Sequence, residues 1–149
     1  MTGTSSSYSV PRRWQQAVLR GTFTVPAAAG FTDSGLSITL PDTGVYRVET
    51  VVHSQLDWTG PGGMTLVARL FNATAGAAVL NASVCVGGLT DPSTGALTLQ
   101  DSGTAFGYVT ATGPTVVRLE GMRSANGTTA RIASSPATGY TSLAYERLA

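Results

Sequence analysis

The sequence predicts an all-β protein built as an antiparallel sandwich of two sheets. Apolar and polar residues alternate with a period of two over many short runs, which is the pattern of strands with one buried face. Clusters of Gly, Pro, Asn, Asp and Ser separate these runs at intervals of roughly 8–12 residues. No long segment shows the 3.6-residue period of a helix. With 149 residues, the chain is expected to form one domain with its own core.

The strands can be placed in order along the chain. The first is expected within residues 14–25 (WQQAVLRGTFTV), and later ones over 104–111, 115–123, 129–134 and 140–148. Turn-forming stretches such as LPDTG, TGPGG and SSPATG are expected to connect strands. Three intervening runs each present one apolar face to the core: Leu36, Ile38 and Leu40; Met64, Leu66, Ala68 and Leu70; and Leu80, Ala82, Val84 and Val86.

Residues 46–58 (YRVETVVHSQLDW) contain the only histidine of the chain, with two carboxylates nearby. A period of two places Tyr46 and Trp58 on one face and Glu49, His53 and Asp57 on the other. Residues four apart on a strand are separated by about 13 Å, so these three polar groups cannot contact one another. The stretch is therefore interpreted as a strand with a polar outer face. The alternative, a catalytic or ligand site, would need partners from a neighbouring strand.

Charge and cysteine content narrow the function classes. Charged residues make up 11% of the chain, the net charge is +1, and all nine basic residues are arginines scattered along the sequence. This pattern argues against a nucleic-acid partner or an anionic membrane surface. The aspartates lie in separate loops without the spacing of a calcium site, so no metal or cofactor is expected. Cys85, the only cysteine, is expected to be buried and inert.

Residues 1–13 are expected to form a flexible N-terminal attachment arm, with residues 14–149 forming the β-sandwich domain. The arm is rich in Ser, Thr and Gly and ends in PRRW, which supplies aromatic and cationic anchors. The alternative is a disordered terminus without a partner. The expected contact residues of the arm are Tyr8, Pro11, Arg12, Arg13 and Trp14.

Aromatic residues offer a second candidate site. Phe106 and Tyr108 share one strand face, and Trp58 and Tyr140 adjoin loops. Trp58 and Tyr140 are candidates for glycan contact, because aromatic rings stack on the apolar faces of sugars. The competing interpretation is that the aromatic side chains fill a core or a subunit interface.

Several stretches carry a family resemblance. LPDTGVYRVETVV, with Gly44, Tyr46 and Val48, resembles the Gly-x-Tyr-x-Val strand of the tumour-necrosis-factor/complement-globular-head superfamily. TGPTVVRLEG resembles the penultimate hairpin region of that family, and TSLAYERLA resembles its last strand. The resemblance implies a jelly roll that assembles as a homotrimer and binds rather than catalyses. The trimer interface is then expected to involve Tyr46, Val48, Leu119, Leu143 and Tyr145.

Domains of this kind also resemble structural proteins of tailed bacteriophages, which sets the functional expectation. The chain is expected to be a non-enzymatic virion protein, a capsid decoration or head-spike protein bound through its arm to the major capsid protein or another virion protein. It is expected to be made in the host cytoplasm, because MTGTSSSYSV lacks the apolar core of a signal peptide, and not to enter a membrane. The alternatives are a tail-tip or tail-fibre protein that recognises a glycan on the host surface, and a small enzyme, which the lone histidine disfavours.

Overall fold

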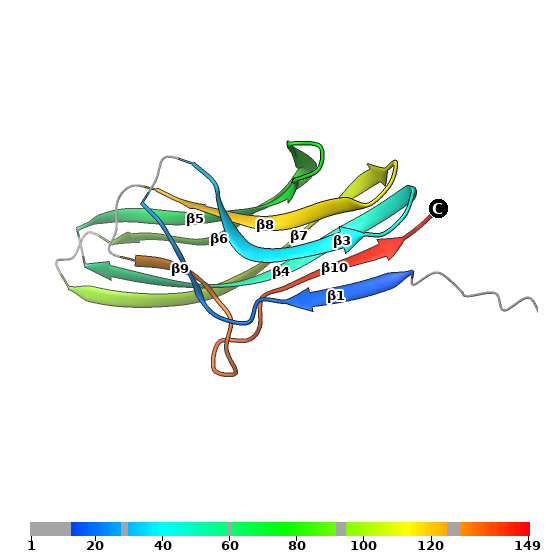
Figure 1. The fold of residues 1–149 in the computed structure, drawn as a ribbon. Helices are drawn as coiled ribbons and strands as arrows, with labels where there is room; N and C mark the ends of the chain where they lie inside the picture. Colours follow the sequence, from blue (N-terminus) through cyan, green and yellow to red (C-terminus); the bar gives the residue numbers. More distant parts are fainter. Residues whose placement is uncertain (1–12, 28–29, 60, 92–94, 125–128) are drawn as a thin grey trace, which may run out of the picture.

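The computed structural model describes residues 13–27, 30–59, 61–91, 95–124 and 129–149, and these form two antiparallel sheets packed face to face (Figure 1). The predicted all-β sandwich is confirmed. The first sheet contains β1 (Trp14–Val18), β2 (Phe23–Val25), β4 (Gly44–Thr59), β7 (Ala96–Ala111), β9 (Thr129–Ala133) and β10 (Ser142–Arg147). The second contains β3 (Thr32–Leu40), β5 (Gly62–Asn72), β6 (Ala77–Asp91) and β8 (Thr115–Arg123).

The order of the strands is that of a jelly roll. The second sheet runs β3-β8-β5-β6; the first runs β1-β10-β4-β9-β2, and β7 pairs with the other edge of β4. β10 and β9 follow one another along the same edge of β4, and they pair in turn with β1 and β2. Each of these two pairs therefore acts as one interrupted strand, which leaves eight strand positions in two four-stranded layers.

The interruption of the first sheet corrects the single strand predicted for residues 14–25. Leu19 leaves the ladder, and its N–H donates to the carbonyl of Thr141 at 2.9 Å. The Thr141 hydroxyl donates to the Ala133 carbonyl at 2.7 Å and accepts from the His53 N–H at 3.0 Å. Ser134 Oγ donates to the Leu19 carbonyl in turn. Side-chain hydroxyls thus satisfy backbone groups where the strands break, and residues 134–141 form a loop beside the sheet (Figure 1).

The core follows the predicted alternation along most strands. Every second residue of β4 from Tyr46 to Trp58 is buried, and the residues between them are partly exposed. The predicted core faces of β3 and β5 are buried throughout. Two hydroxyls inside the sandwich find backbone acceptors: Ser54 Oγ donates to the Val86 carbonyl, and Thr50 Oγ1 donates to the Ser142 carbonyl. Such pairing removes the cost of burying them.

The face predicted for β6 is partly wrong. Leu80 is 81% exposed, whereas its neighbour Val79 is buried together with Ala82. Asn81 adopts a positive φ of 59°, and the pairing of β5 with β6 shifts register between Arg69 and Phe71. Between these pairs β6 has three more residues than β5, and this odd number shifts the alternation and turns Leu80 outward. Cys85 is also exposed rather than buried, between the half-buried Val84 and the buried Val86.

The two sheets approach closely where their edge strands β6 and β7 meet, because β7 carries glycines on its inner face there. A Cβ added to Gly107 would lie 2.6 Å from Val79 Cγ1 and 3.1 Å from the Leu80 carbonyl oxygen. A Cβ at Gly103 would lie 3.0 Å from Val84 Cγ2. These glycines allow β6 and β7 to close the edge of the sandwich.

Gly107→Ala should therefore destabilise the fold by about 1–3 kcal/mol, since the new methyl group forces Val79 or the backbone of β6 to move. Denaturant unfolding measures this change. Gly113→Ala is the matched control, because no heavy atom lies within 4 Å of its Cβ position. Equal stability of the two variants would contradict the close approach of β6 and β7.

Candidate functional site

The outer face of the first sheet gathers aromatic and charged side chains in two rows across four strands. One row runs Trp14, Glu146, Arg47 and Tyr108, as the pairing of β1, β10, β4 and β7 dictates. The next row, two residues along, runs Gln16, Ala144, Glu49 and Phe106. Because side chains alternate along each strand, all of these point away from the core. We call this set of eight residues the outer face.

Large apolar side chains are exposed on this face. Phe106 is 46% exposed, and Tyr108 and Trp14 are each 60% exposed. Phe106 and Tyr108 pack edge to face, with ring centroids 6.2 Å apart. The Arg47 guanidinium lies 4.7 Å from the Phe106 ring centroid and is ion-paired with Glu49 at 2.6 Å. These contacts hold the aromatic pair in place while leaving it open to a partner.

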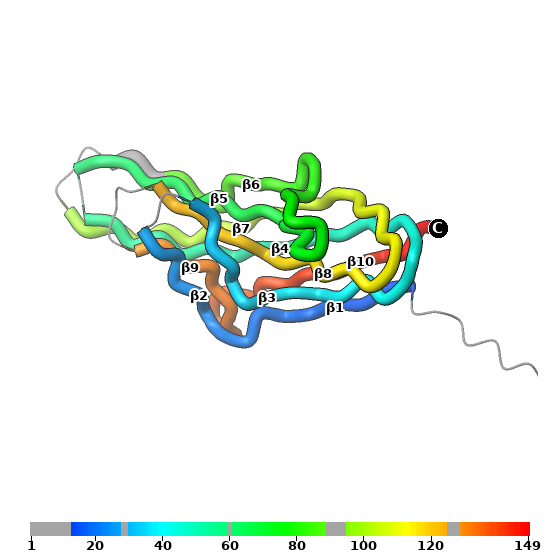
Figure 2. The backbone as a smooth tube through the Cα atoms, turned by 45° about the horizontal axis from the view of Figure 1, so that its top comes forward, coloured from blue at the N-terminus to red at the C-terminus, as the bar shows by residue number. Residues whose placement is uncertain are grey.

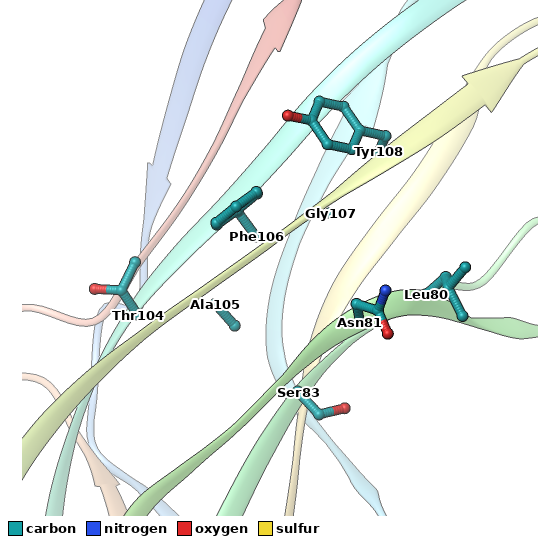
Figure 3. A pocket seen from close by; sticks show the side chains of 8 residues that line it. All are labelled: Leu80, Asn81, Ser83, Thr104, Ala105, Phe106, Gly107 and Tyr108. Atoms are coloured by element: carbon teal, nitrogen blue, oxygen red, sulfur yellow. The ribbon is translucent and has the colours of Figure 1, made fainter.

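A half-open cleft of about 410 Å³ adjoins the aromatic pair at the edge formed by β6 and β7 (Figure 3). Leu80, Asn81 and Ser83 line it from β6, and residues 104–108 line it from β7. None of these lining residues is charged. The cleft exists because the bulge at Asn81 turns Leu80 outward and the glycines of β7 keep the two edges close together. Its chemistry suits a neutral, largely apolar group.

The polar groups of β4 lie on the solvent-facing side, as predicted, and each has its own neighbour. Glu49 is ion-paired with Arg47 of the same strand, and Asp57 is ion-paired with Arg131 of the neighbouring strand β9. The His53 ring lies against the loop of residues 134–141, since a Cβ on Gly139 would be 2.8 Å from its Nε2 atom. The three groups thus act in separate local contacts rather than as one cluster.

Asp57 has a shifted pKa. Its pKa lies below the ordinary aspartate value, chiefly because it accepts a hydrogen bond from Arg131. The Thr98 hydroxyl also donates to Asp57 Oδ1 at 3.0 Å. Partial burial opposes this shift. The pair links β4, β7 and β9 on the outer surface of the sheet.

The outer surface of the second sheet carries a closed charge network. Glu120 is 3% exposed and accepts hydrogen bonds from Arg69 at 2.8 Å and from Arg118 at 2.8 and 3.0 Å. Arg69 stacks over Phe31 at 3.9 Å, and both arginines lie near the Phe71 ring. Every charge in this network has a partner within the network. We therefore assign the network to the packing of β5 against β8 and not to a binding site.

The five residues expected at a trimer interface lie in the core of the protomer, so that expectation is wrong for each of them. Tyr46, Val48, Leu119 and Leu143 are fully buried and Tyr145 is 2% exposed. Their side chains fill the core of the protomer, where Tyr46 and Tyr145 pack edge to face at 5.3 Å. A second copy cannot reach them.

The two candidates for glycan contact, Trp58 and Tyr140, differ in exposure. Trp58 is 4% exposed and belongs to the core, so its proposed contact with a sugar is wrong. Tyr140 is 50% exposed in the loop of residues 134–141.

Of the arm residues, Tyr8, Pro11 and Arg12 lie outside the described residues. Trp14 opens β1, and the carbonyl of Arg13 accepts the Arg147 N–H at 2.7 Å.

Within the described part of the chain, no three His, Cys, Asp or Glu side chains gather as a metal site would require. The same residues include no helix long and apolar enough to span a membrane.

Comparisons with known proteins find likeness in fold. No protein-family model matches the sequence, and no curated protein matches it. The chain is similar to the Eiger TNF of S. frugiperda, with 14% identity, 93% of this chain and 94% of that chain covered, and a TM-score of 0.49. It is similar to infectious bursal disease virus Gx strain (16% identity, 92% and 37% covered, TM-score 0.40) and to the VP2 subviral particle of that virus (17%, 92% and 37%, TM-score 0.46). At these values the likenesses carry no argument about function, and the jelly roll rests on the strand order itself.

Glu120→Gln should destabilise the protein by about 3 kcal/mol, because it leaves two arginines facing an uncharged, buried amide. Thermal or denaturant unfolding measures the loss. Glu49→Gln serves as the control, since both side chains of its ion pair are more than a third exposed and such pairs contribute about 0–1 kcal/mol. Equal losses in the two variants would contradict the closed network.

The Asp57–Arg131 pair should make stability depend on acid pH. The folded pKa of Asp57 is lowered, so its contribution is present above the unfolded value of about 3.9 and is lost as the pH falls through the folded pKa. Asp57→Asn should therefore lower the free energy of unfolding at neutral pH, and its difference from wild type should shrink in acid. Arg131→Gln should lower the free energy of unfolding at neutral pH in the same way, and its difference from wild type should also shrink in acid. A difference that stays constant from pH 7 down to the acid limb would contradict this assignment.

Proposed function

We propose that this protein is a non-catalytic structural component of a bacteriophage particle that assembles as a homotrimer through its outer face. The observation that carries the proposal is the exposed aromatic pair Phe106 and Tyr108, held in a fixed geometry by each other and by Arg47. Rigid, exposed aromatic residues beside an arginine are the typical composition of a protein–protein contact.

The charge distribution supports self-association. Charged residues make up 11% of the chain, against about 25% in typical soluble domains. Several of these charges are used in internal pairs, including Arg47 with Glu49 and the network around Glu120. Few charges therefore remain to keep copies of the chain apart, and burying the aromatic face in a symmetric assembly removes apolar area from water.

The positions of the chain ends support a protein that is attached to the particle at one end of the sandwich. Arg13 and Arg147 are hydrogen-bonded, so the described start of the chain and its C-terminus lie at one end of the sandwich (Figures 1 and 2). The end of β4 and the start of β5 lie at the opposite end (Figure 2). An attachment arm over residues 1–13 would leave the first end and bind the major capsid protein or another virion protein, with the opposite end directed outward. The proposed role as a decoration or head-spike protein is supported by this geometry and by the expectation that jelly-roll domains of this kind resemble phage structural proteins.

The alternative of a tail-tip or tail-fibre protein that binds a host glycan gains no support from the candidate residues. Trp58 lies in the core, which leaves Tyr140 without the second ring of the expected platform.

The size of the particle in solution tests the homotrimer. Light scattering should give three times the protomer mass of 15.2 kDa. Tyr108→Arg should shift the protein toward monomer, because it places a solvated cation within the aromatic face. Tyr140→Arg is the matched control, since it replaces a similarly exposed tyrosine outside this face. A wild-type protein that stays monomeric at micromolar concentration would contradict the proposal.

Deletion of residues 1–12, which keeps the Arg13 carbonyl that accepts the Arg147 N–H, tests the attachment arm. The truncated protein should keep its circular dichroism spectrum and its mass as a trimer, yet lose binding to purified particles, as measured by co-sedimentation. Truncated protein that binds particles at full occupancy would show that attachment uses another surface.

A further inference from the structure

We propose that Trp14 of one copy inserts into the cleft between β6 and β7 of a second copy, so that the trimer closes through a protruding residue and a cleft at opposite edges of one sheet. This inference rests on the proposed self-association and names the two surfaces that meet. It assigns a partner to the cleft and a role to Trp14 within the assembly.

Trp14 is exposed in a way that favours a protein contact. It is 60% exposed on β1, the edge strand next to β10, and it points outward with the rest of the outer face. Tryptophan contributes more binding energy than most residues when it enters a pocket, because its ring buries a large apolar area and loses little entropy.

Trp14 cannot fill the cleft of its own chain. Its row crosses β10 and β4 before it reaches Tyr108 on β7. Three spacings between neighbouring strands separate the two residues by about 14 Å along the sheet. Only another copy can therefore bring a Trp14 side chain to the cleft.

The cleft fits an indole ring in size and chemistry. Its volume of about 410 Å³ leaves room for one tryptophan side chain, and Leu80, Phe106 and Tyr108 supply apolar surface. No lining residue is charged, so a neutral ring enters without desolvating an ion. Asn81 and Thr104 supply side-chain oxygens that can accept a hydrogen bond from the indole N–H.

The charged groups near the two surfaces are one acidic side chain beside Trp14 and one ion pair beside Phe106. Glu146 lies directly beside Trp14 in the same row, is exposed, and forms no ion pair with any residue that the structure describes. Arg47 lies 4.7 Å from the Phe106 ring centroid and is already paired with Glu49 of its own chain. Because Arg47 is already paired, the size of the cleft and its uncharged lining, rather than charge, argue for Trp14 as its occupant.

The two surfaces differ, so the contact is heterologous. Each copy offers its Trp14 to one neighbour and its cleft to the other, and such contacts form a closed ring when the rotation between copies allows it. A homotrimer is one such ring. This arrangement predicts that two defective variants can complement each other when they are mixed.

Two measurements on the full chain test the inference. In a Trp58→Phe background, Trp14 is the only tryptophan, and its emission should shift to shorter wavelength and resist acrylamide quenching as the trimer forms. If Trp58→Phe does not fold, the difference spectrum between wild type and Trp14→Phe gives the same information. Sedimentation should show that Trp14→Ala and Leu80→Arg each weaken association roughly 30-fold, whereas Leu97→Arg, at an exposed leucine of β7 outside the cleft, should leave it unchanged.

Mixing Trp14→Ala with Leu80→Arg should restore part of the association, because the first retains an intact cleft and the second an intact Trp14. A wild-type trimer whose Trp14 remains fully quenchable would overturn the inference and leave the proposed trimer standing. A trimer weakened by Leu80→Arg but not by Trp14→Ala would also overturn it, because the cleft would then hold another group. A protein that is monomeric throughout would overturn both proposals.

Discussion

The pairing of β4 along both of its edges is the constraint on which the rest of the structure depends. One edge pairs with β7 over the full length of the strand, and the other pairs first with β10 and then with β9. The strict alternation of β4 then divides its side chains into a buried set and an outer set. The buried set joins the two sheets through the core, and the outer set places Arg47 beside Phe106. The core and the candidate interaction surface are thus two sides of one strand.

The second important feature is the edge where β6 meets β7. Glycines on the inner face of β7 let the sheets approach, and the positive φ of Asn81 turns Leu80 out toward solvent. Together they form an uncharged cleft next to the exposed aromatic pair. A bulge at the edge of a sheet commonly redirects a side chain in this way. In the proposed assembly, this local irregularity forms the surface that a second copy contacts.

Much of the fold could be predicted from the sequence, because alternation with a period of two places β3, β4, β5 and β8 directly. The alternation gives the wrong face for Leu80, because the positive φ of Asn81 shifts it. The flanking sequence contains no signal for this shift. The break between β1 and β2 is not predictable from the local sequence, because it depends on the Ser134 hydroxyl and the Thr141 carbonyl, which bond Leu19 from more than a hundred residues away in the chain. The burial of Glu120 was missed for a similar reason, since it depends on Arg69 from another strand.

The candidate site shows where a family resemblance and strand geometry disagree. The resemblance places Tyr46 at a trimer interface, and aromatic stacking makes Trp58 a glycan candidate. Alternation instead sets both on the face of β4 opposite its polar groups, and both are buried. Phe106 and Tyr108 were recognised as sharing a face, but their neighbours from β4 and β6 become visible only with the strand register. Pairwise register therefore carries information about the surface that no single stretch contains.

The most direct test of the central claim is hydroxyl-radical footprinting of the wild-type protein as a function of concentration. Our account predicts that Phe106 and Tyr108 become protected as the assembly forms, while Tyr140 and Leu97 keep the reactivity that their exposure implies. Equal reactivity of Phe106 and Tyr108 in dilute monomer and in the concentrated assembly would contradict the claim that the outer face is the surface of self-association.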